Sequence, residues 1–88
     1  MAARPQLLTI PSQLGAVLRS SRRARRLSQT DLARRIGLSQ ARVSHLEQHP
    51  QDVNFEQLMA WCAALGLELY VAPKGTRLES QSTTTPAW

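Results

Sequence analysis

Two groups of side chains in this 88-residue sequence have the types and the spacing to do chemistry. The first is a run of basic residues. Residues 19–42 contain eight arginines against one acid, Asp31, whereas residues 43–88 carry a net charge of −3. Arginine suits phosphate because its planar guanidinium donates several hydrogen bonds at once, and basic charge concentrated in one segment favours a polyanionic partner such as nucleic acid. A solvated basic helix face is the alternative that composition alone leaves open.

The second group lies around a triplet, Leu-Ser-Gln, that occurs at residues 27–29 and again at residues 38–40. The similarity stops after three residues, so a duplication does not explain it. Both serines, Ser28 and Ser39, precede a short amphipathic stretch, and a serine hydroxyl that accepts a free N–H of the first helical turn is a typical N-cap. The triplets therefore predict two helix starts.

Neighbouring residues support these two helices. Leu27 and Leu38 precede the caps, where a leucine can pack back onto its own helix as a hydrophobic staple. Gly37 lies where the first helix must end, and glycine fills such a position without steric cost. The pattern predicts helices over residues 29–36 and 40–48 joined by a tight turn, which is a helix-turn-helix.

The outward face of the second helix carries the candidate recognition residues. Val43 and Leu46 define its buried side, so the side chains predicted to read bases are Gln40, Ala41, Ser44 and His45. Glutamine can bond adenine through both groups of its amide, alanine can contact a thymine methyl, and serine and histidine can donate or accept at base edges. The predicted phosphate-binding residues are Ser28, Gln29, Ser39, Arg42, Arg26 and Arg23.

Two further helices must position these groups. One begins at Pro11, because proline suits the first helical position, and continues with apolar residues at helical spacing. The other follows Asn54, a plausible N-cap, and is closed by Gly66. Its apolar stripe is predicted to be core and consists of Phe55, Leu58, Met59, Cys62 and Leu65. Trp61 falls near the edge of this stripe and is predicted to lie in the core or in a dimer interface.

Residues 67–72 alternate with period two and are rich in strand formers, which predicts one short strand. Its pairing residues are predicted to be Leu67, Leu69, Tyr70 and Val71. A lone strand needs a partner for its backbone groups, and the sequence offers no second strand, so we expect it to pair with the same strand of a second copy.

The predicted organisation is a flexible leader (1–10), a helix-turn-helix domain (11–66), the dimer-pairing strand (67–72) and a disordered tail (73–88), which is polar. Trp88 closes the tail. One interpretation is an anchor that fills a pocket on a partner, a second is a tail that proteases cut when it is free, and the third is chance.

Other functional classes find little support. His45, His49 and Cys62 match no zinc-ligand spacing, and the sequence has neither a nucleophile–base arrangement nor a glycine-rich phosphate loop, so we expect no metal, no cofactor and no enzyme activity. The basic region lacks the interleaved aromatic residues typical of RNA binding. A single cysteine and the absence of a long apolar run indicate an unprocessed cytoplasmic protein without a membrane segment.

Residues 27–48 resemble the lambda-repressor-like, or Xre-type, helix-turn-helix family, and the similarity extends over about residues 11–66. The residues that carry it are Gln29 at the start of the helix over residues 29–36, Ala33, Gly37, Val43, Leu46 and Glu47. The resemblance implies an all-α bundle of four to five helices that binds a palindromic operator as a homodimer. It also implies that Gln29 contacts phosphate, that Gln40 reads a base, and that Arg22 and Glu47 form a structural ion pair.

The layout of the whole chain is similar to that of HipB antitoxins. The shared features are a leader that enters the first helix through residues 11–14, one strand after the last helix, and a short tail that ends in tryptophan. This resemblance implies a repressor that autoregulates its operon and neutralises a HipA-like serine/threonine kinase toxin. Ser39 stands where a lysine often precedes the recognition glutamine, so the operator sequence does not transfer. A stand-alone dimeric regulator without a toxin is the alternative.

Overall fold

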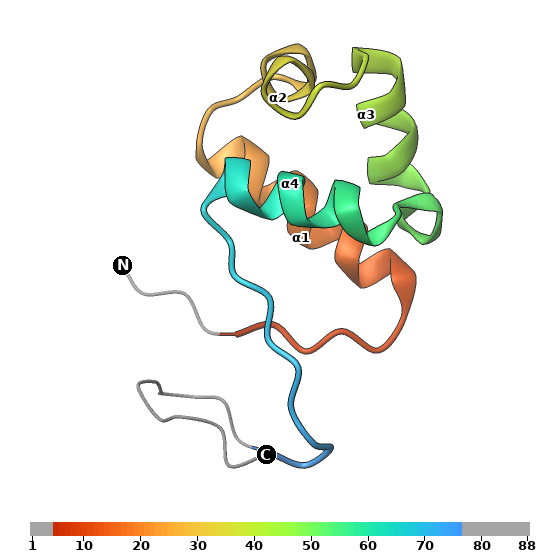
Figure 1. Cartoon of the computed structure of the whole chain (residues 1–88), viewed down its shortest axis with the longest axis vertical. Helices are drawn as coiled ribbons and strands as arrows, with labels where there is room; N and C mark the ends of the chain where they lie inside the picture. Colours follow the sequence, from red (N-terminus) through yellow and green to blue (C-terminus); the bar gives the residue numbers. More distant parts are fainter. Residues whose placement is uncertain (1–4, 77–88) are drawn as a thin grey trace.

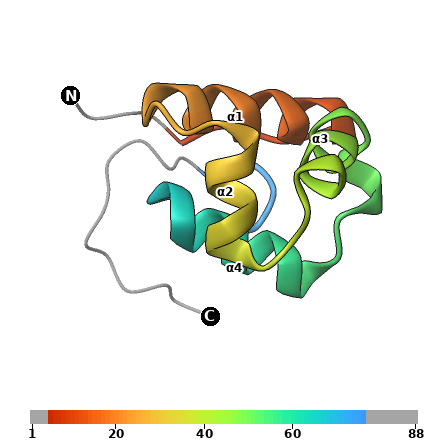
Figure 2. The same cartoon turned by 90° about the horizontal axis from the view of Figure 1, so that it is seen from above.

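The computed structural model describes residues 5–76, which form a bundle of four α-helices and one short 3-10 helix (Figure 1). The elements are α1 (Pro11–Ala24), α2 (Gln29–Ile36), α3 (Gln40–Gln48), η1 (Pro50–Asp52) and α4 (Phe55–Leu65). The predicted all-α helix-turn-helix bundle is therefore confirmed, and its two central helices have the predicted bounds. Seen from above, α2 crosses between α1 and α4, and α3 lies to one side (Figure 2).

Both predicted serine caps are formed. The Ser28 Oγ accepts a hydrogen bond from the Asp31 N–H at 2.9 Å, and the Ser39 Oγ accepts one from the Arg42 N–H at 3.0 Å. Each bond satisfies a backbone donor that the helix itself leaves unpaired. Gly37 ends α2 with a φ of 74°, a conformation that glycine adopts without steric cost. The tight turn between α2 and α3 thus follows from local chemistry.

The core lies where the four helices meet. Its fully buried side chains come from every α-helix: Leu18, Leu32, Val43, Leu46, Trp61 and Leu65. Burying each such side chain contributes roughly 1.5–3 kcal/mol. Leu27 and Leu38, the two predicted staples, are partly buried against this core. The packing holds α3 by its inner side and leaves its outer side open.

The predicted apolar stripe of α4 is wrong in two places. Phe55 is 71% exposed and Met59 is 48% exposed, whereas Trp61 is completely buried. The physical reason is that the apolar arc of α4 is wider than the surface that the bundle can cover. The core takes the side of the arc that contains Trp61 and Leu65, and the opposite side is left uncovered in the single chain.

Helices α1 and α3 approach each other closely at Gly15. A Cβ atom at this position would lie 2.5 Å from the Glu47 backbone oxygen and 3.2 Å from the Pro50 Cγ atom. No real Cβ makes the first contact without a shift of the neighbouring helix. Gly15 therefore sets how deep α3 lies against α1.

The predicted strand over residues 67–72 is not formed: residues 5–76 contain no strand. This segment leaves α4 and runs away from the helices (Figure 1), and Tyr70 and Val71 are exposed. A strand exists only when its N–H and C=O groups meet those of a neighbour, and none is present in one copy. The pairing across a dimer stays a prediction, and Trp88 lies outside the described residues, as do the rest of 77–88 and residues 1–4.

No helix in the described part of the chain is both long and apolar enough to span a bilayer.

Candidate nucleic-acid interface

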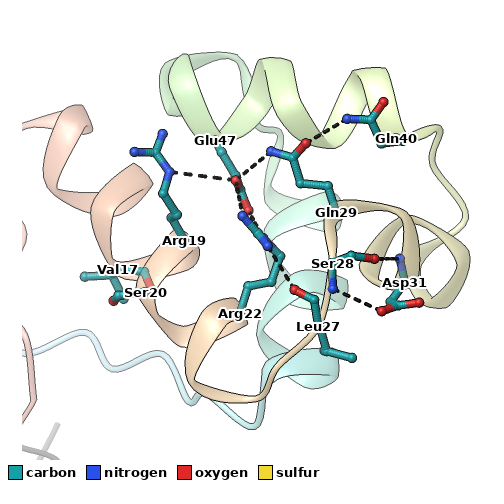
Figure 3. A network of polar contacts seen from close by, with 10 residues as sticks. All are labelled: Val17, Arg19, Ser20, Arg22, Leu27, Ser28, Gln29, Asp31, Gln40 and Glu47. Atoms are coloured by element: carbon teal, nitrogen blue, oxygen red, sulfur yellow. Dashed lines mark hydrogen bonds and ion pairs between the residues drawn. The ribbon is translucent and has the colours of Figure 1, made fainter.

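A buried ion pair underlies the candidate interface. The Arg22 Nε donates to Glu47 Oε2 at 2.6 Å and the Arg22 Nη2 donates to Glu47 Oε1 at 3.1 Å (Figure 3). The two residues are only 8% and 2% exposed. The remaining arm of the guanidinium, Nη1, donates to the Leu27 carbonyl at 2.9 Å. The structure thus brings together the two residues expected to pair, and it ties them to the turn that precedes α2.

Gln29 carries this network from the core to the start of α3. Its Nε2 donates to Glu47 Oε1 at 3.1 Å, and its Oε1 accepts from the Gln40 Nε2 at 2.7 Å (Figure 3). An ionised carboxylate only accepts hydrogen bonds, so Glu47 fixes which way the Gln29 amide faces. The Gln29 oxygen in turn fixes the Gln40 amide.

The orientation of Gln40 suits base recognition. One Gln40 N–H is used by Gln29, while the second N–H and the Oε1 have no hydrogen bond within residues 5–76. A free N–H beside a free carbonyl oxygen is the pair that adenine N7 and N6 require in the major groove. The structure places Gln40, exposed at the N-terminus of α3, with this pair available.

The two helix starts that share the Leu-Ser-Gln triplet differ in charge. At α2, the Ser28 N–H also donates to Asp31 Oδ2 at 3.0 Å, and this bond, followed by the Ser28 hydroxyl beside the carboxyl, lowers the pKa of Asp31. At α3, Arg42 occupies the corresponding position and the first turn contains no acid. A helix N-terminus attracts anions, so the start of α3 is the better phosphate site. Ser28 is already engaged within α2.

The other predicted base-reading residues also lie on α3. Ala41 is exposed and Ser44 is half-buried. His45 is exposed, but its Nε2 lies 2.8 Å from Asp52 Oδ2 on η1, and its ring stacks on His49 with the centroids 4.8 Å apart. Sequence analysis did not find Asp52, because a contact between a helix and the loop that follows it has no periodic signal.

The predicted phosphate-binding arginines lie near the end of α1, in the turn that follows it, and in the first turn of α3. Arg23, Arg26 and Arg42 are exposed, whereas Arg22 is withdrawn into the buried pair. Arg19 lies with its Nε 3.9 Å from Glu47 Oε1. The exposed guanidinium groups are therefore free to meet phosphates, and the buried one is structural.

A metal site has no corresponding geometry within residues 5–76. No group of three histidine, cysteine, aspartate or glutamate side chains there could hold a metal ion. Cys62 is buried, and burial raises the pKa of its thiol, which disfavours the nucleophilic thiolate. The groups that the surface offers are hydrogen-bond donors, acceptors and positive charge.

Comparison with known proteins agrees with this geometry. A family model described as "Helix-turn-helix domain" matches residues 13–69. The chain belongs to this helix-turn-helix family. An uncharacterized HTH-type transcriptional regulator of Sinorhizobium fredii, y4dL, is 37% identical over 57 residues, which are 65% of this chain but 29% of that protein. The chain thus spans less than a third of the length of this relative.

Solved structures of HipB complexes have the same fold. The chain matches one in the HipA-HipB-O2-O3 complex with a TM-score of 0.72 and 24% identity, covering 80% of this chain and 99% of the other. It matches one in a HipB-O1-O2 complex with a TM-score of 0.71 and 25% identity, covering 78% and 100%. The predicted resemblance to HipB is therefore confirmed for the fold.

Proposed function

We propose that this helix-turn-helix protein is a sequence-specific repressor that binds a palindromic operator in double-stranded DNA as a homodimer. The observation that carries the proposal is the chain of hydrogen bonds that runs from the buried Arg22–Glu47 pair through Gln29 to Gln40. A side chain held by the core and still carrying a free donor and a free acceptor is preorganised to read a base.

Within this proposal, the α3 surface divides into two roles. Gln40, Ala41, Ser44 and His45 read base edges in the major groove, since they lie on the outer side of α3. The backbone N–H groups at Ser39 and the guanidinium groups of Arg23, Arg26 and Arg42 bind phosphates on either side. Contacts of the first kind confer specificity, and contacts of the second kind supply affinity and register.

The homodimer is supported by the apolar side chains that one copy leaves uncovered. Phe55, Met59, Tyr70 and Val71 are exposed on α4 and on the segment that follows it. Large exposed apolar residues gathered in one region commonly mark an interaction surface. We propose that residues 67–72 pair with the same residues of a second copy, which would also satisfy their backbone groups.

We further propose that the protein is an antitoxin that neutralises a HipA-like serine/threonine kinase toxin and represses its own operon. The support is the fold shared with HipB chains, one of which is solved together with HipA. The alternative, a stand-alone dimeric regulator, is favoured by the S. fredii relative, which is named only as a transcriptional regulator.

The DNA-binding proposal is tested with duplexes selected from a random-sequence library by the full chain. We expect a variant with Gln40→Glu and Ser44→Glu to lose sequence-specific binding, because two carboxylates on α3 repel phosphate and cannot donate to bases. A variant with Ser12→Glu and Ala16→Glu, both exposed on α1, adds the same charge elsewhere and should retain binding. Equal affinity of the first variant and the parent would contradict the proposal.

The toxin partnership is tested by co-expression of the chain with the product of the neighbouring gene. If that product has a kinase sequence and co-purifies with the chain, the antitoxin function is supported. If purification recovers the chain with DNA but without a protein partner, the stand-alone regulator is the correct alternative.

A further inference from the structure

His45 is held by a residue outside α3. Its Nε2 lies 2.8 Å from Oδ2 of Asp52, which belongs to η1. The ring also stacks on His49 at an interplanar angle of 30°. Two contacts therefore restrain one exposed side chain of the candidate interface, and both come from residues that follow it in the chain.

The contact with Asp52 selects a tautomer. A carboxylate can only accept, so the proton of a neutral His45 ring must be on Nε2, and Nδ1 is left as an acceptor. Nδ1 makes no hydrogen bond within residues 5–76. In the opposite tautomer Nδ1 would be a donor. It would then suit the acceptors N7 and O6 of guanine and could not accept from an amino group.

We propose that Asp52 is a positioning residue for base recognition. It holds His45 as the Nε2–H tautomer, so that Nδ1 accepts a hydrogen bond from the exocyclic amino group of adenine or cytosine in the major groove. The inference rests on the proposed DNA-binding function and adds a base preference at the operator position that faces His45.

The pair is better suited to this role than to stabilising the fold. The side chains of His45 and Asp52 are 43% and 48% exposed, and a contact between exposed polar groups contributes little to stability. The backbone of Asp52 is anchored separately, since its N–H donates to the His49 carbonyl at 2.9 Å. Replacing the carboxylate should therefore leave η1 and the rest of the fold in place.

The experiment compares single-base-pair variants of a duplex selected from a random-sequence library, at mildly alkaline pH where imidazole is neutral. For the parent chain we expect one position to prefer adenine or cytosine. Asp52→Ala should reduce that preference about five- to tenfold, the worth of roughly one hydrogen bond, with other positions unchanged. Asp52→Asn should retain most of it, because the amide oxygen can still accept from Nε2–H. Gln51→Ala, an exposed neighbour on η1, is the matched control and should change nothing.

A double-mutant cycle separates positioning from an independent effect of Asp52. In a His45→Ala background, Asp52→Ala should have no additional effect on the preference. If His45→Ala alters the preference and Asp52→Ala does not, the inference is overturned and the proposed function stands. If neither variant alters it, His45 does not read a base. If the parent chain selects no duplex at all, the proposed function fails and the inference fails with it.

A spectroscopic measurement is independent of DNA. Long-range proton–nitrogen correlation of the His45 ring reports which nitrogen carries the proton. We expect Nε2–H in the parent chain and a mixture of tautomers in Asp52→Ala. Nδ1–H in the parent chain would overturn the inference even if the DNA preferences were as expected.

Discussion

At the Glu47 carboxylate, three helices meet: Arg22 donates to it from α1, Gln29 donates to it from α2, and Glu47 itself belongs to α3. The carboxylate is almost fully buried, so its charge has no water to solvate it. Removing one member of a buried ion pair leaves the other unpaired, which costs more than the pair itself contributes. Through Gln29, the same residue also orients the Gln40 amide.

Glu47→Gln should therefore lower the free energy of unfolding by about 3–5 kcal/mol, a large part of the total stability of a small domain. Urea denaturation measures this change. Glu56→Gln, which removes an exposed acid on α4, is the control and should have a small effect. A Glu47→Gln protein with the urea midpoint of the parent would show that the pair does not contribute as the geometry indicates.

Asp31 provides a prediction in the acid range. The Ser28 N–H and then the Ser28 hydroxyl hold the pKa of Asp31 below its ordinary value of 3.8. A carboxyl whose pKa is lower in the folded than in the unfolded state stabilises the fold above the unfolded pKa, and this contribution disappears as the pH falls through the folded pKa. Ser28→Ala removes the hydroxyl and should raise the pKa of Asp31 toward 3.8. An NMR titration of the carboxyl carbon measures it, and Ser39→Ala should leave the titration unchanged.

Among the elements, the turn between α1 and α2 contains a residue with an unfavourable backbone conformation. Arg26 has a φ of 57°, in the left-handed region that costs a non-glycine residue about 1–2 kcal/mol. Within residues 5–76 it is the only non-glycine residue with a positive φ. Its guanidinium is exposed, which fits the proposed contact with phosphate. An arginine at a position that favours glycine thus costs backbone stability and puts an exposed positive charge in the turn before α2.

Two variants separate these effects at Arg26. Arg26→Gly should raise the free energy of unfolding by about 1 kcal/mol relative to Arg26→Ala, because only glycine relieves the backbone. Both variants lose the same charge, so both should weaken operator binding equally and lower the slope of log affinity against log salt by about one. Denaturant unfolding and salt-dependent binding measure the two effects. Equal stabilities would contradict the strain, and an unchanged slope would contradict the phosphate contact.

At the scale of the whole molecule, the exposed Met59 of α4 lies beside the unpaired segment that follows the helix. Met59, Leu67, Leu69 and Tyr70 line one shallow depression, and Val71 beside them is exposed. A chain of 88 residues buries a smaller share of its surface than a larger domain does, so covering these side chains with a second copy would add stability. The same pairing would set two copies of α3 for successive major grooves, ~34 Å apart.

Tyr70→Asp with Val71→Asp should convert the proposed dimer to a monomer, because two carboxylates at the pairing edge repel their copies. Sedimentation velocity measures the mass, and circular dichroism should show unchanged helix content. Ser12→Asp with Ala16→Asp on α1 is the control and should remain dimeric. Footprinting with the monomeric variant should show weakened protection of a palindromic site, and a parent chain that protects a single half-site as a monomer would contradict the dimer.

Local chemistry explains how much of the fold could be predicted. Five residues are helix caps: Ser28, Ser39, Asn54, Gly37 and Gly66. A cap acts within about one helical turn, so the sequence alone shows where a helix begins or ends. The choice of apolar face on α4 could not be predicted, because Phe55 and Trp61 are both apolar and only the surrounding helices determine which is covered. The strand over residues 67–72 could not be verified in one copy, since its partner groups belong to another chain.

The sequence by itself determined the two helices of the motif, their caps, and the basic and polar side chains that surround them, because these depend on neighbours a few residues away. Only the tertiary structure decided that Gln29 lies between Glu47 and Gln40, and that Asp52 holds His45. These contacts join residues from different elements, and their geometry depends on how closely α1, α2, α3 and η1 pack. The sequence supplies the donors and acceptors, but the packing of the bundle determines their orientation.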